Sequence, residues 1–202
     1  MRRRYEMRAR AESAERTRAA IIAGAHRLLN RRDGTALTLQ EVAVASGVSR
    51  ATIYKSIGSR TELLRAVFED QGRLIKFERV LAAIQIDDPR AAVIATIRES
   101  CRAWSVFPHA IRKTLALAAI DPEIAELVNR YERSRRARLA QLAGRLPGAG
   151  RSRARIESFA ETLALLTSYA TYDHLGLNHD ARWVADFLVQ TAVSCLDLGD
   201  DL

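Results

Sequence analysis

Residues 46–60, SGVSRATIYKSIGSR, interrupt a stretch that otherwise has the pattern of one continuous helix. The interruption begins at Ser46-Gly47, a helix resumes for two turns, and Gly58 breaks it again. A helix of two turns is marginal on its own. The pattern therefore predicts a short helix that is held in place by neighbouring helices.

The composition favours an all-α protein, because four prolines and ten glycines in 202 residues leave room for long helices. Helix caps, helix stops and apolar periodicity predict about nine helices. We expect them at about 11–31, 39–46, 50–56, 59–80, from 89, from 108, 121–145, 152–174 and 180–197, with a loop at 146–150. The expected domains are 1–70 and 71–202.

The net charge of +8 is concentrated in the first third of the chain, where residues 1–70 hold 14 lysines and arginines against 8 acids. This excess predicts a polyanionic partner. Cys101 and Cys195 are far apart, which disfavours a disulfide scaffold or a zinc finger. There is no apolar run of transmembrane length, no signal peptide and no catalytic constellation. We expect a cytoplasmic protein that is not an enzyme and has no cofactor.

The residues around the interruption have the chemistry of helix caps. Thr38 followed by Glu41 is a capping box for the helix at 39–46, and Gly47 is a stop signal. Ser49 is expected to cap the next helix, and Ser59 the one after it. Two short helices are therefore separated by a tight turn.

Four residues of this segment form the signature of a helix-turn-helix: Ala43 allows a close helix crossing, Gly47 makes the turn, and Val48 and Ile53 anchor the second helix. A short helix of small and basic residues suits the major groove of DNA.

The run LTLQEVAVASGVSRATIYKSIGSRTELLRAVFE, with its surroundings at 17–70, resembles the DNA-binding domain of the tetracycline-repressor (TetR) family of bacterial regulators. The run departs from the family pattern at Ser56 and Ile57, where an aromatic residue or histidine and a phenylalanine are common. The resemblance implies a DNA-binding surface made of Thr38, Ser49, Arg50, Ala51, Thr52, Tyr54, Lys55, Ser56 and Arg60.

Within this surface, Thr38, Tyr54 and Arg60 would hold phosphates. Arg50 or Lys55 would contact guanine, and the methyl groups of Ala51 and Thr52 would pack against thymine. The alternative is a solvated helical face without a partner.

For residues 71–202 the resemblance implies a ligand-binding and dimerisation domain. The candidates for an inducer pocket are Trp104, Phe107, His109, Phe159 and Tyr169, with plain core as the alternative for each. The helices at 152–174 and 180–197 would form a four-helix dimer interface through Ile156, Phe159, Leu163, Leu166, Trp183, Phe187 and Leu188. The alternative is a monomeric core.

Two features keep more than one interpretation. His174 and His179 lie near aspartates, but the cluster is looser than a metal site requires, and we expect no metal. The basic arm MRRRYEMRAR either contacts DNA or is a solvated tail.

Together with these patterns, the resemblance implies a repressor that binds a palindromic operator as a homodimer and is released by a small-molecule inducer, which we expect to be largely apolar. The alternatives are a constitutive DNA-binding regulator without an inducer, or a basic helical module that binds a membrane or a protein partner.

Overall fold

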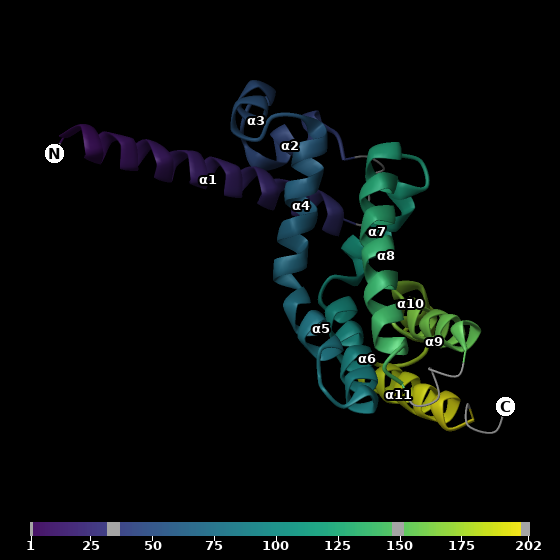
Figure 1. The fold of residues 1–202 in the computed structure, drawn as a ribbon. Helices are drawn as coiled ribbons and strands as arrows, with labels where there is room; N and C mark the ends of the chain where they lie inside the picture. The colour runs from purple at the N-terminus through teal and green to yellow at the C-terminus, as the bar shows by residue number, and fades with distance from the viewer. Residues whose placement is uncertain (1, 32–36, 147–151, 199–202) are drawn as a thin grey trace. The chain divides into compact units, whose positions relative to one another are not determined.

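A computed structural model describes residues 2–31, 37–146 and 152–198, and these residues form eleven helices and no strands (Figure 1). The all-α class is confirmed, whereas the expected number of about nine helices is wrong. The helices are α1 (Arg2–Asn30), α2 (Leu39–Ser46), α3 (Arg50–Ser56), α4 (Arg60–Leu74), α5 (Phe77–Ile84), α6 (Pro89–Val106), α7 (Pro108–Ala118), α8 (Pro122–Ala143), α9 (Arg153–Leu166), α10 (Tyr169–Leu175) and α11 (Ala181–Leu198).

The first additional helix arises because the segment predicted as one helix at 59–80 ends at Leu74. Lys76 has φ 53° and ψ 53°, a left-handed conformation that a continuing helix cannot contain. Arg102 Nη2 donates to the carbonyl oxygens of Ile75 at 2.8 Å and Lys76 at 3.2 Å. The break is therefore stabilised by a side chain of α6, which the local sequence does not reveal.

The second additional helix arises because the segment predicted at 152–174 is interrupted between α9 and α10. The side chain of Ser168 caps α10 by accepting a hydrogen bond from the Thr171 N–H at 3.1 Å. The Thr171 hydroxyl donates in turn to the Leu165 carbonyl at 2.7 Å. The two hydroxyl groups form hydrogen bonds with backbone groups at the end of α9 and the start of α10. Fewer backbone N–H and carbonyl groups are therefore left unpaired by the break.

Other predicted boundaries are close to the observed ones, with three exceptions. α1 begins at Arg2, well before the predicted residue 11, so the basic arm is the first part of that helix. The predicted stop at Asp33-Gly34 lies outside the described residues, and so does the predicted loop from residue 147 on.

The described chain forms two compact units, the first of which contains Met1–Gly72 and Arg112–Leu127. Its core joins α1, α2, α3 and α4 through buried side chains that include Ile21, Ala25, Val42, Ile53 and Leu64. α1 and α2 approach closely at Gly24, where a Cβ would lie 2.9 Å from the Cβ of Ser46. From α7, Lys113 Nζ donates to the Leu28 carbonyl near the end of α1 at 2.8 Å.

The second unit contains Arg73–Ile111 and Val128–Leu202. Its core is apolar and draws on α5, α6, α8, α9 and α11, with buried residues that include Val80, Ile84, Val93, Ile97, Leu139, Leu142, Leu163, Val184 and Leu188. None of the helices in the described segments is both long enough and apolar enough to cross a membrane.

Candidate functional site

The turn between α2 and α3 takes only three residues and is fixed by backbone geometry. Gly47 has φ 71° and ψ 23°, the left-handed conformation that glycine adopts at little cost. The Val48 N–H donates to the Ala43 carbonyl at 3.2 Å, and the Ser49 hydroxyl accepts from the Thr52 N–H at 3.0 Å. These bonds end one helix and begin the next in a fixed orientation, as the caps predicted.

α3 has one buried face and one exposed face. Ile53 is fully buried, and Ile57, directly after the helix, is buried as well. The exposed residues are Arg50, Ala51, Tyr54 and Lys55, while Thr52 and Ser56 are half-buried. Because α3 contains no acidic residue, its exposed face carries positive charge on a small, rigid element.

Thr38 and Tyr54, two of the predicted phosphate ligands, lie in different local environments. The Thr38 hydroxyl donates to Glu41 Oε2 at 2.9 Å and accepts from the Glu41 N–H at 3.2 Å, so it is part of the capping box. The Tyr54 side chain is 50% exposed. Both residues lie on the surface, but only Tyr54 extends from α3 itself.

Arg60, the third predicted phosphate ligand, is paired with two carboxylates of the same unit. Its guanidinium group forms ion pairs with Asp121, just before α8, and with Glu123, in the first turn of α8. Burial acts to lower the pKa of Arg60, but hydrogen bonds to Asp121 and Glu123 outweigh it and raise the pKa. Burial acts to raise the pKa of Asp121, but the hydrogen bond from Arg60 and the nearby backbone N–H groups lower it.

The second unit encloses a cavity of about 20 Å³, which is room for a single water molecule. It is lined by Phe77, Val80, Leu81, Ile84, Thr96, Ser100, Ala103, Trp104, Tyr131, Arg135, Arg138, Leu139 and Thr167. The Thr96 hydroxyl is buried and has no hydrogen-bond partner. A small apolar cavity with a free hydroxyl group is suited to one polar atom of a ligand or to a water molecule.

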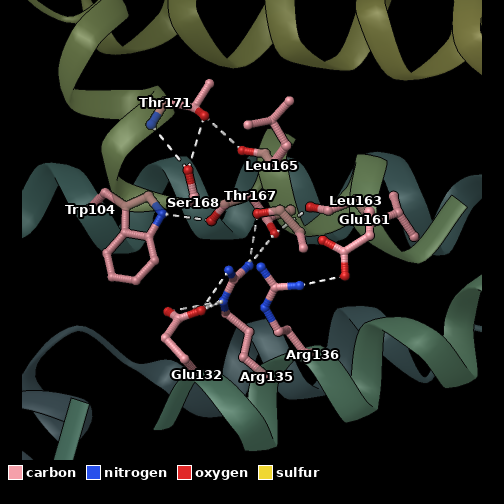
Figure 2. Close-up of polar contacts among 11 residues, drawn as sticks. Trp104, Glu132, Arg135, Arg136, Glu161, Leu163, Leu165, Thr167, Ser168 and Thr171 are labelled. Carbon is pink, nitrogen blue, oxygen red and sulfur yellow. Dashed lines mark hydrogen bonds and ion pairs between the residues drawn. The ribbon is translucent and has the colours of Figure 1, made fainter. Parts of the chain in front are cut away.

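One side of the cavity is held together by polar contacts at the break between α9 and α10 (Figure 2). Trp104 Nε1 donates to the Thr167 carbonyl at 3.1 Å. Arg135 of α8 donates to the Ala164 carbonyl at 3.2 Å and to Thr167 Oγ1 at 2.9 Å, and it forms an ion pair with Glu132 at 2.8 Å. Arg135 therefore has little capacity left for a ligand.

Of the five predicted pocket residues, only Trp104 lines the cavity. Tyr169 packs edge-on against Trp104, with ring centroids 5.8 Å apart, and donates its hydroxyl hydrogen to the Pro108 carbonyl or to Asp173. Phe107 and Phe159 pack against the core, and His109 is exposed.

Several lining residues were not predicted from the sequence. Tyr131 of α8 packs against Phe77 of α5, with ring centroids 5.6 Å apart, and burial raises the pKa of its phenol to about 12. Phe77 follows directly after the break at Lys76. Since the break itself was not predicted, the direction of α5 and its contribution to the cavity had no signal in the sequence.

Comparison with known proteins finds a family match for one segment of the chain. Residues 21–67, which run from α1 into α4, match the family model of bacterial regulatory proteins of the tetR family. This segment is similar to the DNA-binding part of tetR-family regulators. The matched residues contain the whole of α2, the turn at Gly47 and α3.

Curated relatives match over part of their length. An uncharacterized HTH-type transcriptional regulator of Mycobacterium tuberculosis is 31% identical over 93 residues, which cover 45% of this chain and 46% of the relative. The HTH-type transcriptional regulator BetI of Rhizobium meliloti is 30% identical over 125 residues, which cover 60% and 62% of the two chains. The chain thus spans about half the length of the Mycobacterium tuberculosis regulator and 62% of the length of BetI.

A solved structure extends the likeness of fold to most of the chain. A transcriptional regulator from Rhodococcus sp. Rha1 superposes with a TM-score of 0.62 at 15% sequence identity, covering 88% of this chain and 96% of that one. At this identity the comparison shows a shared fold and no more.

The residues predicted for a TetR-type dimer interface fall into two groups. Leu163, Leu166 and Leu188 are buried in the core of the second unit, and Ile156 and Phe159 are half-buried against it. Trp183 and Phe187, by contrast, are 42% and 45% exposed. Their rings stack on α11 with centroids 5.0 Å apart, and His179 stacks on Trp183 at 3.5 Å.

The described residues contain no group of three or more histidine, cysteine or acidic side chains placed to hold a metal ion. His179 belongs to the aromatic stack on α11, and His174 is exposed near the end of α10.

Proposed function

We propose that this chain is a DNA-binding transcriptional regulator of the TetR type that reads the major groove with α3. The observation that carries the proposal is the burial pattern of α3: Ile53 is fully buried, while Arg50 and Lys55 are exposed. A basic helix without acidic residues is attracted to phosphates and can donate to guanine in the major groove. Arg50 and Lys55 would read bases, and Tyr54 would hold a phosphate.

The experiment is selection of bound DNA from a random pool with the full chain. We expect enrichment of a palindrome, because two copies of α3 related by a two-fold axis read two equal half-sites about one helical turn, roughly 34 Å, apart. A pool that stays random, with binding that depends only on salt, would contradict sequence-specific regulation.

We further propose that the chain acts as a homodimer through α11. The support is the exposed stack of Trp183 and Phe187, because two stacked aromatic rings that are each partly exposed on one helix offer an apolar surface for a partner helix to cover. Paired half-sites in DNA favour the same arrangement. Repression of genes beside the operator is the form of regulation that we propose for this dimer.

Release from DNA by a small molecule is the remaining part of the proposal, and the cavity beside Trp104 is its candidate site. A ligand that binds the DNA-free state more tightly must lower DNA affinity by the same factor. We expect a largely apolar compound that offers one hydrogen bond to Thr96. It would have to enlarge the cavity, whose volume of about 20 Å³ has room for only one water molecule.

The small volume of the cavity favours a second candidate function, a regulator that binds its operator without an inducer. A compound screen by thermal shift, followed by operator binding, separates the two. Compounds that stabilise the protein and release the operator support an inducer, provided that Thr96→Val reduces both effects. Compounds that stabilise the protein without changing DNA affinity support the constitutive regulator.

A further inference from the structure

Arg60, Asp121 and Glu123 form a cluster in which one cation is shared by two anions, all within the first unit. Arg60 Nη2 is paired with Asp121 Oδ2, and Arg60 Nη1 lies 2.6 Å from Glu123 Oε2 and 3.4 Å from Asp121 Oδ1. Both terminal nitrogens of the guanidinium group therefore donate hydrogen bonds to carboxylates of the same chain.

Both carboxylates are held in place independently of Arg60. Asp121 Oδ1 accepts the N–H groups of Glu123 at 3.1 Å and Ile124 at 3.4 Å, which makes it the N-terminal cap of α8. Glu123 Oε1 accepts the hydroxyl hydrogen of Thr61 at 3.1 Å. The acids are thus a preformed anionic pair, and the long arginine side chain is the member that is free to leave.

The start of α4 already contains another anion of the chain. Glu62 Oε2 accepts the backbone N–H of Ser59 at 2.7 Å and its hydroxyl hydrogen at 3.0 Å. Arg60 is the only basic residue in the first turn of α4, and it forms ion pairs with two carboxylates. The cluster of Arg60, Asp121 and Glu123 has a net charge of −1, which opposes the approach of a phosphate.

We propose that Asp121 and Glu123 compete with a DNA phosphate for Arg60. This inference rests on the proposed function, because the competing anion is a phosphate of bound DNA. In the DNA-free protein the two acids hold the guanidinium group and weaken binding to any DNA sequence. To contact DNA the arginine would have to leave at least one carboxylate, and the remaining acids would repel the phosphates, so this contact is largely absent in the wild type.

Partial exposure allows this exchange. The side chains of Arg60, Asp121 and Glu123 are 28%, 22% and 44% exposed, so a phosphate can reach the arginine without unfolding the unit. Exchange of one charge-assisted pair for another has a modest net free energy, which makes the balance sensitive to the number of competing acids.

The experiment compares operator and unrelated DNA binding of the full chain and of Asp121→Asn, Glu123→Gln and the double variant over a range of salt concentrations. We expect the double variant to bind both DNAs about three- to tenfold more tightly, with a salt slope steeper by roughly 0.9, the value for one added phosphate contact. The matched control is Glu15→Gln with Glu69→Gln, which removes the same charge from two exposed positions of the same unit.

Arg60→Ala separates competition from a structural role. We expect Arg60→Ala to change the DNA affinity of the wild type little. In the double variant we expect the same substitution to remove the gain in DNA affinity. If the acids only position α4, their loss weakens binding and Arg60→Ala has the same effect in both backgrounds, which overturns the proposal. The more exposed Glu123→Gln provides the same test if the double variant does not fold.

Failure of the proposed function has a different signature. If neither the wild type nor the matched control binds any DNA from the selection, the proposed DNA-binding function is wrong, and the proposed competition for Arg60 is wrong as well. If both bind and the double variant is no tighter than the control, the competition alone is wrong.

Discussion

Trp104 donates its indole N–H to the main-chain carbonyl of Thr167, 3.1 Å away, where α9 ends. The bond is buried and joins residues 63 positions apart in the sequence. It supplies a donor to a carbonyl that the helix break would otherwise leave without one. Trp104 also lines the cavity, so the same side chain fixes the helix break and one wall of the candidate ligand site.

Trp104→Phe should therefore destabilise the second unit. The phenyl ring has no donor for the Thr167 carbonyl and is smaller than the indole, so we expect a loss of about 2–4 kcal/mol in the free energy of unfolding. Urea unfolding followed by circular dichroism measures it. Trp183→Phe makes the same chemical change at a side chain that is 42% exposed and should cost less. Equal losses at the two positions would contradict the role given to the buried bond.

Arg50 and Tyr54 should affect DNA binding in different ways. Arg50→Ala removes a proposed base contact, so we expect discrimination at particular base pairs to fall by about 1–3 kcal/mol each. Tyr54→Ala removes a proposed phosphate contact, so operator and unrelated DNA should both be bound more weakly, with a shallower salt dependence. Competition binding with single-base variants of the selected site measures both effects. A uniform loss for Arg50→Ala on all sequences would show that it contacts the backbone.

The helix-turn-helix was predictable because each of its determinants acts over a few residues. The capping box of Thr38 and Glu41, the turn at Gly47 and the cap at Ser49 all involve partners within three to five positions, and all are present. Local hydrogen-bond chemistry decides such features, so the sequence carries them directly.

The features that the sequence did not reveal depend on distant partners. The break at Lys76 contains neither glycine nor proline, and it is stabilised by Arg102. The acidic partners of Arg60 lie 61 and 63 positions away. Apolar periodicity continues through Thr167, where the distant contacts of Trp104 and Arg135 add to the local hydrogen bonds of Ser168 and Thr171. Charge and periodicity do not specify which distant side chain meets which backbone group.

The two groups of predicted interface residues should respond differently to an introduced charge. Phe187 is 45% exposed, so Phe187→Asp should leave the subunit folded and shift the protein from dimer to monomer in sedimentation equilibrium. Leu163 is 3% exposed and belongs to the core of its own subunit, so Leu163→Asp should prevent folding by burying a charge without a partner.

The control for the interface is Ile120→Asp, which places the same charge at an apolar residue that is 76% exposed and lies in the first unit. It should remain dimeric. A folded Phe187→Asp variant that sediments as a dimer would remove α11 from the interface.

Cys101 should make the stability of the protein depend on pH in the alkaline range. It is 3% exposed, and burial raises the pKa of its thiol from the ordinary 9.0 to about 11. The folded state therefore favours the protonated thiol, and this contribution is complete below pH 9 and lost as the pH rises through 11. A difference of two pH units corresponds to about 2–3 kcal/mol.

Because other groups also titrate in this range, the measurement is a comparison with Cys101→Ala. The variant loses stability at every pH through the smaller side chain, but its free energy of unfolding should fall less steeply than that of the wild type between pH 9 and pH 11. Urea unfolding at pH 8, 9, 10 and 11 gives the two curves. Parallel curves would show that the Cys101 thiol ionises at the same pH in the folded and unfolded protein, and that water reaches it in the folded state.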